Sequence, residues 1–67
     1  MRRTLPLAPL ERLMRKAGAE RVSEDAVIAL RDSIEDMARE VADEALRAAR
    51  HARRRTIKRE DIELAVR

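Results

Sequence analysis

Apolar residues in the middle of the chain recur at the spacing of one helix face. They follow one another in steps of three or four residues and are Val27, Leu30, Ile34, Met37, Val41, Ala45, Ala48 and Ala52. At 100° per residue, this stripe stays within an arc of roughly 80°. Ser23 is a typical N-cap, and Glu24 and Asp25 suit the positive end of the helix dipole. The pattern therefore predicts a long helix over residues 24–52.

Shorter apolar patterns on either side of this stripe predict two further helices. A proline suits the first turn of a helix over about 9–17, and Gly18 is a natural left-handed stop. After a basic turn, a third short helix is expected over about 59–67. The sequence thus predicts an all-α chain in one domain over 1–67, with helices in the order short, long and short and a basic tip at residues 1–5.

The chain is too small to cover the long helix by itself. About 29 residues make a helix of roughly 43 Å, whereas a compact globule of this size is about 28 Å across. The sequence has no cysteine and one histidine, so neither disulfides nor a thiolate or paired-histidine metal site can stabilise it. We therefore expect a second copy of the chain to cover the stripe, with an extended coiled coil as the alternative.

Charge is distributed unevenly along the sequence. Residues 1–21 carry +4, residues 22–44 carry −6 and residues 45–67 carry +5, which gives the net +3. Two cationic ends indicate a polyanionic partner such as nucleic acid. No apolar run is long enough to span a membrane, and no signal peptide is recognisable. The acidic pairs lie on the polar face of the long helix without a nucleophile or a glycine-rich loop, so no enzymatic activity is expected.

Two separated stretches resemble the beginning and the end of archaeal histones. The first is Ala17-Gly18-Ala19-Glu20-Arg21-Val22-Ser23, and the second is Arg54-Arg55-Thr56-Ile57-Lys58 followed by Glu60-Asp61-Ile62-Glu63-Leu64-Ala65-Val66-Arg67. They occur in the right order, and the resemblance covers nearly the whole chain. It implies the histone fold, in which two chains form a head-to-tail handshake dimer with crossed long helices.

The resemblance also implies which residues contact DNA. They lie in the first helix and in the two loops, and are Arg12, Arg15, Arg21, Arg55 and Thr56. Arg21 is expected to enter the minor groove, and Arg55 and Thr56 to bind phosphates. Arg54 is expected to pair with Asp61 inside the chain and to brace the second loop.

Two protein interfaces follow from the same resemblance. The dimer core is expected at Leu30, Ile34, Met37 and Val41. Contacts between dimers are expected at Ala48, His51 and Asp61. Relatives often have a larger aliphatic residue in place of Ala48, so the strength of the contact between dimers is open. Heterodimers with another histone, and the roles of Arg53 and of the Arg2-Arg3 tip, are also open.

The sequence therefore predicts a homodimeric archaeal-type histone in the cytoplasm, associated with the chromosome and with neither cofactor nor metal. It would bind double-stranded DNA largely without sequence specificity, and would bend, wrap and compact it, with multimers of dimers left open. One alternative is a histone-fold module of a protein complex, which would lack the loop cations. Another is an unrelated antiparallel helical dimer, which predicts no DNA affinity at low salt.

Overall fold

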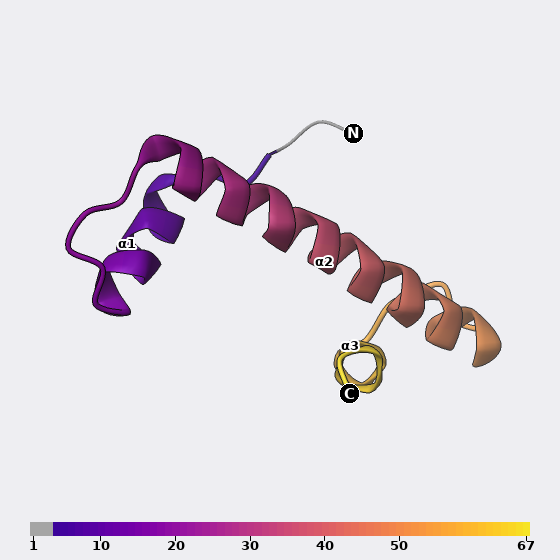
Figure 1. Cartoon of the computed structure of the whole chain (residues 1–67). Helices are drawn as coiled ribbons and strands as arrows, with labels where there is room; N and C mark the ends of the chain where they lie inside the picture. Colours follow the sequence, from indigo (N-terminus) through magenta and orange to yellow (C-terminus); the bar gives the residue numbers. More distant parts are fainter. Residues whose placement is uncertain (1–3) are drawn as a thin grey trace. The chain divides into compact units, whose positions relative to one another are not determined.

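A computed structural model describes residues 4–67 and contains three α-helices within them (Figure 1). α1 spans Ala8–Lys16, α2 spans Glu24–His51 and α3 spans Arg59–Ala65, and no strand occurs in this part of the chain. The all-α class and the order of a short, a long and a short helix are confirmed. α1 begins and ends one residue earlier than expected, α2 ends one residue earlier and α3 two residues earlier. The Arg2-Arg3 tip lies outside the described residues.

The chain divides into two compact units, and the boundary falls between Asp36 and Met37, inside α2. The first unit contains α1 and the N-terminal part of α2. The second contains the C-terminal part of α2 and α3. None of the helices in residues 4–67 combines the length and the apolar character that a membrane span needs.

Local hydrogen bonds explain where the long helix begins and how the chain enters α1. The Ser23 hydroxyl accepts a hydrogen bond from the Ala26 N–H at 3.1 Å, as expected of an N-cap. The Glu35 carboxylate accepts hydrogen bonds from the backbone N–H groups of Thr4 and Leu5, at 2.9 and 2.7 Å. One side chain of α2 therefore fastens the segment that precedes α1.

α1 ends in a Schellman motif. The Gly18 N–H donates to the Arg15 carbonyl at 3.0 Å, and the Ala19 N–H donates to the Met14 carbonyl at 3.2 Å. This arrangement requires a residue with positive φ after the helix, and Gly18 supplies it at +111°. Glycine has no Cβ, so this conformation is available to it without a steric penalty.

α2 ends in the same motif without a glycine. The Arg53 N–H donates to the Arg50 carbonyl and the Arg54 N–H to the Ala49 carbonyl, both at 2.9 Å. Arg53 takes the left-handed position with φ +59°, and no other non-glycine residue of the described chain has a positive φ. A left-handed conformation costs a residue with a Cβ roughly 1–2 kcal/mol. The end of α2 is thus strained where the end of α1 is not.

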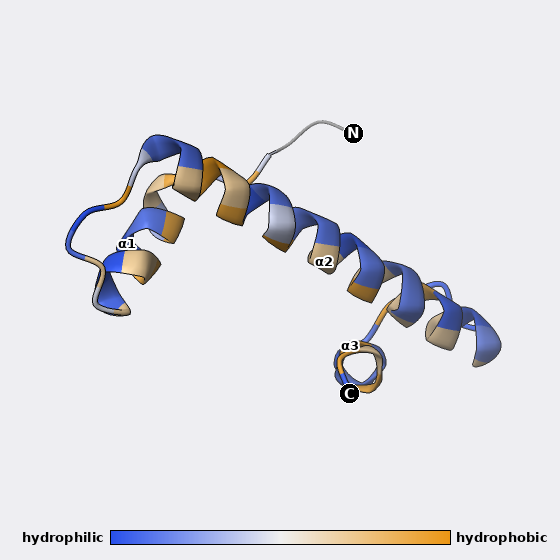
Figure 2. Ribbon diagram, in the orientation of Figure 1, coloured by the Kyte–Doolittle hydropathy of each residue, from blue (hydrophilic) through white to orange (hydrophobic). Residues whose placement is uncertain are grey.

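The core of a single chain is small. The buried apolar residues are Leu10, Val27, Ala45 and Ala49. Large apolar residues that stay exposed are Leu5, Leu13, Met37, Ile57, Ile62, Leu64 and Val66. Of the expected dimer core, Leu30, Ile34 and Val41 are half-buried. Met37 is 64% exposed, and apolar positions follow one side of α2 in Figure 2. The chain by itself leaves most of its stripe uncovered.

Candidate nucleic-acid interface

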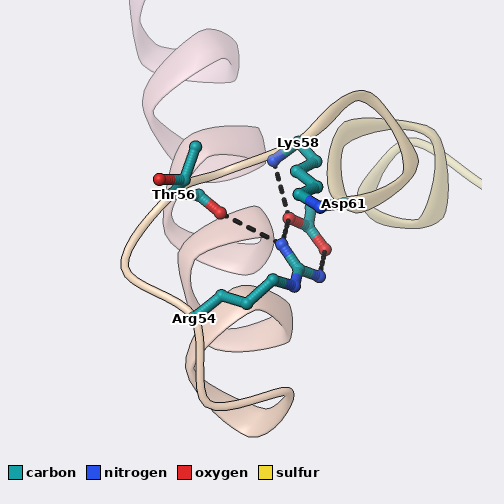
Figure 3. A network of polar contacts seen from close by, with 4 residues as sticks. All are labelled: Arg54, Thr56, Lys58 and Asp61. Carbon is teal, nitrogen blue, oxygen red and sulfur yellow. Dashed lines mark hydrogen bonds and ion pairs between the residues drawn. The ribbon is translucent and has the colours of Figure 1, made fainter.

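The second loop, residues 52–58, is organised by one ion pair (Figure 3). Arg54 donates from Nη1 to Asp61 Oδ2 at 2.8 Å and from Nη2 to Asp61 Oδ1 at 2.9 Å. Nη1 also donates to the carbonyl oxygen of Thr56 at 3.0 Å. Arg54 and Asp61, which we expected to pair, therefore form a two-pronged contact that spans the loop and also holds its backbone.

Asp61 links this loop to the third helix. Its Oδ2 accepts a hydrogen bond from the Lys58 N–H at 2.8 Å, next to the first turn of α3. The side chain is 4% exposed. Hydrogen bonds from Arg54 and from the Lys58 backbone lower the pKa of Asp61 to about 2. The pKa of Arg54 is raised, chiefly by its hydrogen bond to Asp61, so the pair is charged at neutral pH.

Arg55 and Thr56 lie within this braced loop, and both are exposed. The Arg55 side chain forms no hydrogen bond or ion pair with another residue of the range 4–67. Thr56 gives its carbonyl oxygen to Arg54, while its hydroxyl stands apart from the network (Figure 3). The structure thus brings Arg54, Thr56 and Asp61 together and leaves the Arg55 guanidinium available for an external anion.

The first loop, residues 17–23, is organised differently. Arg21 is exposed, and its side chain has no polar partner among the described residues. It lies at an open, mostly apolar pocket of about 760 Å³ lined by Met14, Ala17, Ala19, Arg21, Val22, Ser23 and Ala26. The first loop therefore combines a cation that lacks an internal partner with an apolar surface that its own unit does not fill.

The two arginines expected to contact DNA from α1 differ in their surroundings. Arg12 is exposed, whereas Arg15 pairs with Glu11 at 3.0 Å and donates to the Glu20 carbonyl at 3.4 Å. The Arg15–Glu11 pair was not anticipated, although its i,i+4 spacing could have indicated it. An exposed pair of this kind contributes about 1 kcal/mol or less, so it is easily exchanged for a phosphate.

The three residues expected between dimers also differ in exposure. His51 is exposed and Ala48 is half-buried. Asp61 is only 3% exposed and is already engaged by Arg54 and Lys58. Its surroundings explain a structural role inside the chain, while a role between dimers stays a prediction.

The described part of the chain offers anion-binding groups rather than a metal centre. No group of three or more histidine, aspartate or glutamate side chains within residues 4–67 is arranged to hold a metal ion. The exposed cations of the two loops and of α1 can bind phosphate oxygens by charge and by hydrogen bonding. The strained Arg53 belongs to the same second loop, and no sequence signal had given it a role.

Comparisons with known proteins identify the class to which these helices and cationic loops belong. The family model described as histone-like transcription factor (CBF/NF-Y) and archaeal histone matches residues 3–66. The chain is 60% identical over 62 residues to an archaeal histone HAN1 subunit of Thermococcus zilligii, covering 92% of each chain. It is 44% identical over 63 residues to probable archaeal histone 3 of Methanocaldococcus jannaschii, covering 94% of each.

A short helix, a long helix and a short helix joined by two basic loops define a histone-fold protein. The chain belongs to the family that includes the archaeal histones, as the resemblance of its two end motifs implied. It is therefore a histone-fold protein of the DNA-binding, chromatin-forming type that associates with another histone chain, and it is not an enzyme.

Proposed function

We propose that two copies of the chain form a handshake homodimer in which the long α2 helices cross. The uncovered stripe supports this, above all Met37, which is 64% exposed in the single chain. Leu13 and Leu64 are 57% and 59% exposed and offer further apolar area to a partner. Each Å² of apolar surface removed from water stabilises the dimer by about 25 cal/mol. The partner would supply the core that 67 residues cannot build alone.

In this dimer, the first loop of one chain lies beside the second loop of its partner, which gives two paired-loop sites per dimer. The observation that carries the proposal is that the Arg54–Asp61 brace fixes the second loop while Arg55 keeps no internal partner. Arg21 enters the minor groove from the first loop, and Arg55 and Thr56 bind phosphates from the second.

The proposed activity is to bind double-stranded DNA largely without sequence specificity and to bend, wrap and compact it. Phosphate contacts dominate such binding, and arginine inserted into the minor groove accommodates the bend. Arg12 and Arg15 would add backbone contacts from α1. The protein would then act on the chromosome, in the cytoplasm.

Assembly beyond the dimer would use Ala48, His51 and Asp61 near the end of α2 and the start of α3. Alanine buries little apolar area, so this contact would be weaker than the handshake itself. A heterodimer with a second histone chain is the other candidate assembly, favoured because one relative is named as a subunit. Native mass spectrometry of the chain purified alone separates the two, because a stable homodimer needs no second chain.

Nuclease digestion of DNA bound at several protein ratios tests the proposed function. A ladder of regular steps is expected from stacked dimers, and one protected length from a closed particle. The variant Arg21→Ala/Arg55→Ala is the control, since it removes both proposed loop contacts and should lose protection. Absence of protection by the unaltered protein at any ratio would overturn the proposal.

A further inference from the structure

The same backbone motif ends two helices with different residues. After α1, the position that needs a positive φ is occupied by Gly18, whereas after α2 it is occupied by Arg53 with φ +59°. A glycine at position 53 would adopt this conformation without strain, as Gly18 shows for α1. The arginine is therefore unfavourable for the backbone at this position, and its side chain must be examined for a compensating contact.

Folding gives the Arg53 side chain no such contact. The residue is exposed, and its guanidinium forms no hydrogen bond or ion pair with any residue of the range 4–67. Its neighbours Arg54 and Arg55 carry the same charge, so the local electrostatic environment is repulsive. Attraction to the negative end of the α2 dipole is the one favourable term within the chain, and it is weak at an exposed site.

The position of Arg53 suits an external anion. It is two residues from Arg55 and three from Thr56, in the loop whose backbone Arg54 and Asp61 hold in place. The Schellman hydrogen bonds fix the backbone of Arg53 itself, at 2.9 Å to the Arg50 carbonyl. A long cationic side chain on a fixed backbone loses less freedom when it binds a phosphate than one on a mobile loop.

We propose that Arg53 is a further DNA-contact residue, which binds a backbone phosphate beside the contact of Arg55 and is maintained at the expense of backbone strain. This inference rests on the proposed function of the second loop. It adds one phosphate contact per chain and two per dimer. Each neutralised phosphate contributes about 0.9 to the salt dependence of binding, so the two copies contribute about 1.8 to the slope.

Three substitutions separate charge from backbone effects. Arg53→Gly removes the charge and the strain, Arg53→Asn removes the charge but tolerates the left-handed conformation, and Arg53→Lys keeps the charge. The unaltered dimer and each variant are titrated with a duplex DNA at several salt concentrations, and their melting temperatures are measured without DNA. We expect Arg53→Gly and Arg53→Asn to bind several-fold more weakly with a slope lower by about 2. Arg53→Lys should retain the slope, and Arg53→Gly should melt no lower than the unaltered protein.

An unchanged slope in Arg53→Gly and Arg53→Asn would overturn the inference, and more plainly so if both also melted lower, since Arg53 would then act on the helix end alone. Arg55→Ala is measured alongside to separate this inference from the function on which it rests. If Arg55→Ala lowers the slope and the Arg53 variants do not, the inference about Arg53 alone is wrong. If Arg55→Ala also leaves the slope unchanged, the proposed loop interface is wrong.

Discussion

The two loops that flank α2 are both basic and both follow a Schellman motif, yet only the second is braced by its own chain. The second loop carries a bidentate Arg54–Asp61 pair, and its Thr56 carbonyl accepts a further hydrogen bond from the same guanidinium. The first loop has no such pair, and Arg21 lies instead at an open pocket of about 760 Å³. One loop is thus preorganised by polar contacts, while the other borders apolar surface that is still to be filled.

This difference suggests a division of roles between two chains. A braced loop can offer its cations in a fixed geometry before any partner arrives, which lowers the ordering entropy of binding. A loop beside unfilled apolar surface becomes ordered when another chain covers that surface. In the proposed dimer, each DNA site therefore joins a self-organised loop of one chain to a partner-dependent loop of the other.

The largest effect is expected from a charge placed in the uncovered stripe. Ile34→Asp should abolish folding at micromolar concentration, because an unpaired carboxylate would be buried between chains at a penalty of several kcal/mol. Ser33→Asp is the matched control, since Ser33 is exposed and should tolerate the charge. Circular dichroism and sedimentation measure helicity and mass. A helical monomer from Ile34→Asp would show that neither loop depends on a partner.

Removing one cation from each loop should weaken DNA binding with little effect on the fold. Arg21→Ala/Arg55→Ala deletes four proposed phosphate or groove contacts per dimer, so the salt slope should fall by about 3–4. Melting temperatures without DNA should change little, because neither side chain has an internal partner. Fluorescence anisotropy on two unrelated DNA sequences measures the binding, and a loss confined to one of them would contradict phosphate-dominated recognition.

A smaller effect should distinguish the two helix ends. Gly18→Ala should destabilise the protein by about 1–2 kcal/mol, because alanine is unfavourable at a positive φ. No atom lies within 4 Å of the added Cβ, so this loss reflects backbone conformation rather than a clash. Thermal unfolding at fixed protein concentration measures it. A variant as stable as the unaltered protein would show that strain at Arg53 is also negligible.

The smallest effect is expected from acid and is limited to low pH. The pKa of Asp61 is about 2 in the folded chain, below its ordinary 3.8, so the unfolded chain binds this proton first as the pH falls. The stabilisation from the Arg54–Asp61 pair is therefore complete above pH 4 and is lost as the pH falls towards 2. Asp61→Asn should melt lower than the unaltered protein at pH 7, and the gap should narrow below pH 4. A constant gap down to pH 2 would contradict this assignment.

Much of the helical architecture could be predicted from sequence because its signals are local. The apolar stripe predicted α2, and Ser23 predicted its beginning, where its hydroxyl accepts the Ala26 N–H. The histone fold followed from two end motifs that the family comparison bears out. These features depend on spacing and capping within a few residues, which a single sequence displays directly.

The features that the sequence did not predict depend on three-dimensional contacts or on an unusual backbone. Nothing in the sequence indicates that Glu35 accepts hydrogen bonds from Thr4 and Leu5, about 30 residues away. The positive φ of Arg53 was missed because arginine does not signal a left-handed residue as Gly18 does. The dimer core is also invisible in one chain, because Met37 becomes buried only if a partner covers it.

The central claim is that the first loop of one chain lies beside the second loop of its partner. The chain has no cysteine, so Glu20→Cys and Lys58→Cys chains can each carry a single spin label. Pulsed EPR on a mixture of the two labelled chains then reports only distances between chains. The proposed dimer predicts a short distance in the mixture that neither labelled chain shows by itself, whereas the absence of that distance from a folded, dimeric mixture would contradict the claim.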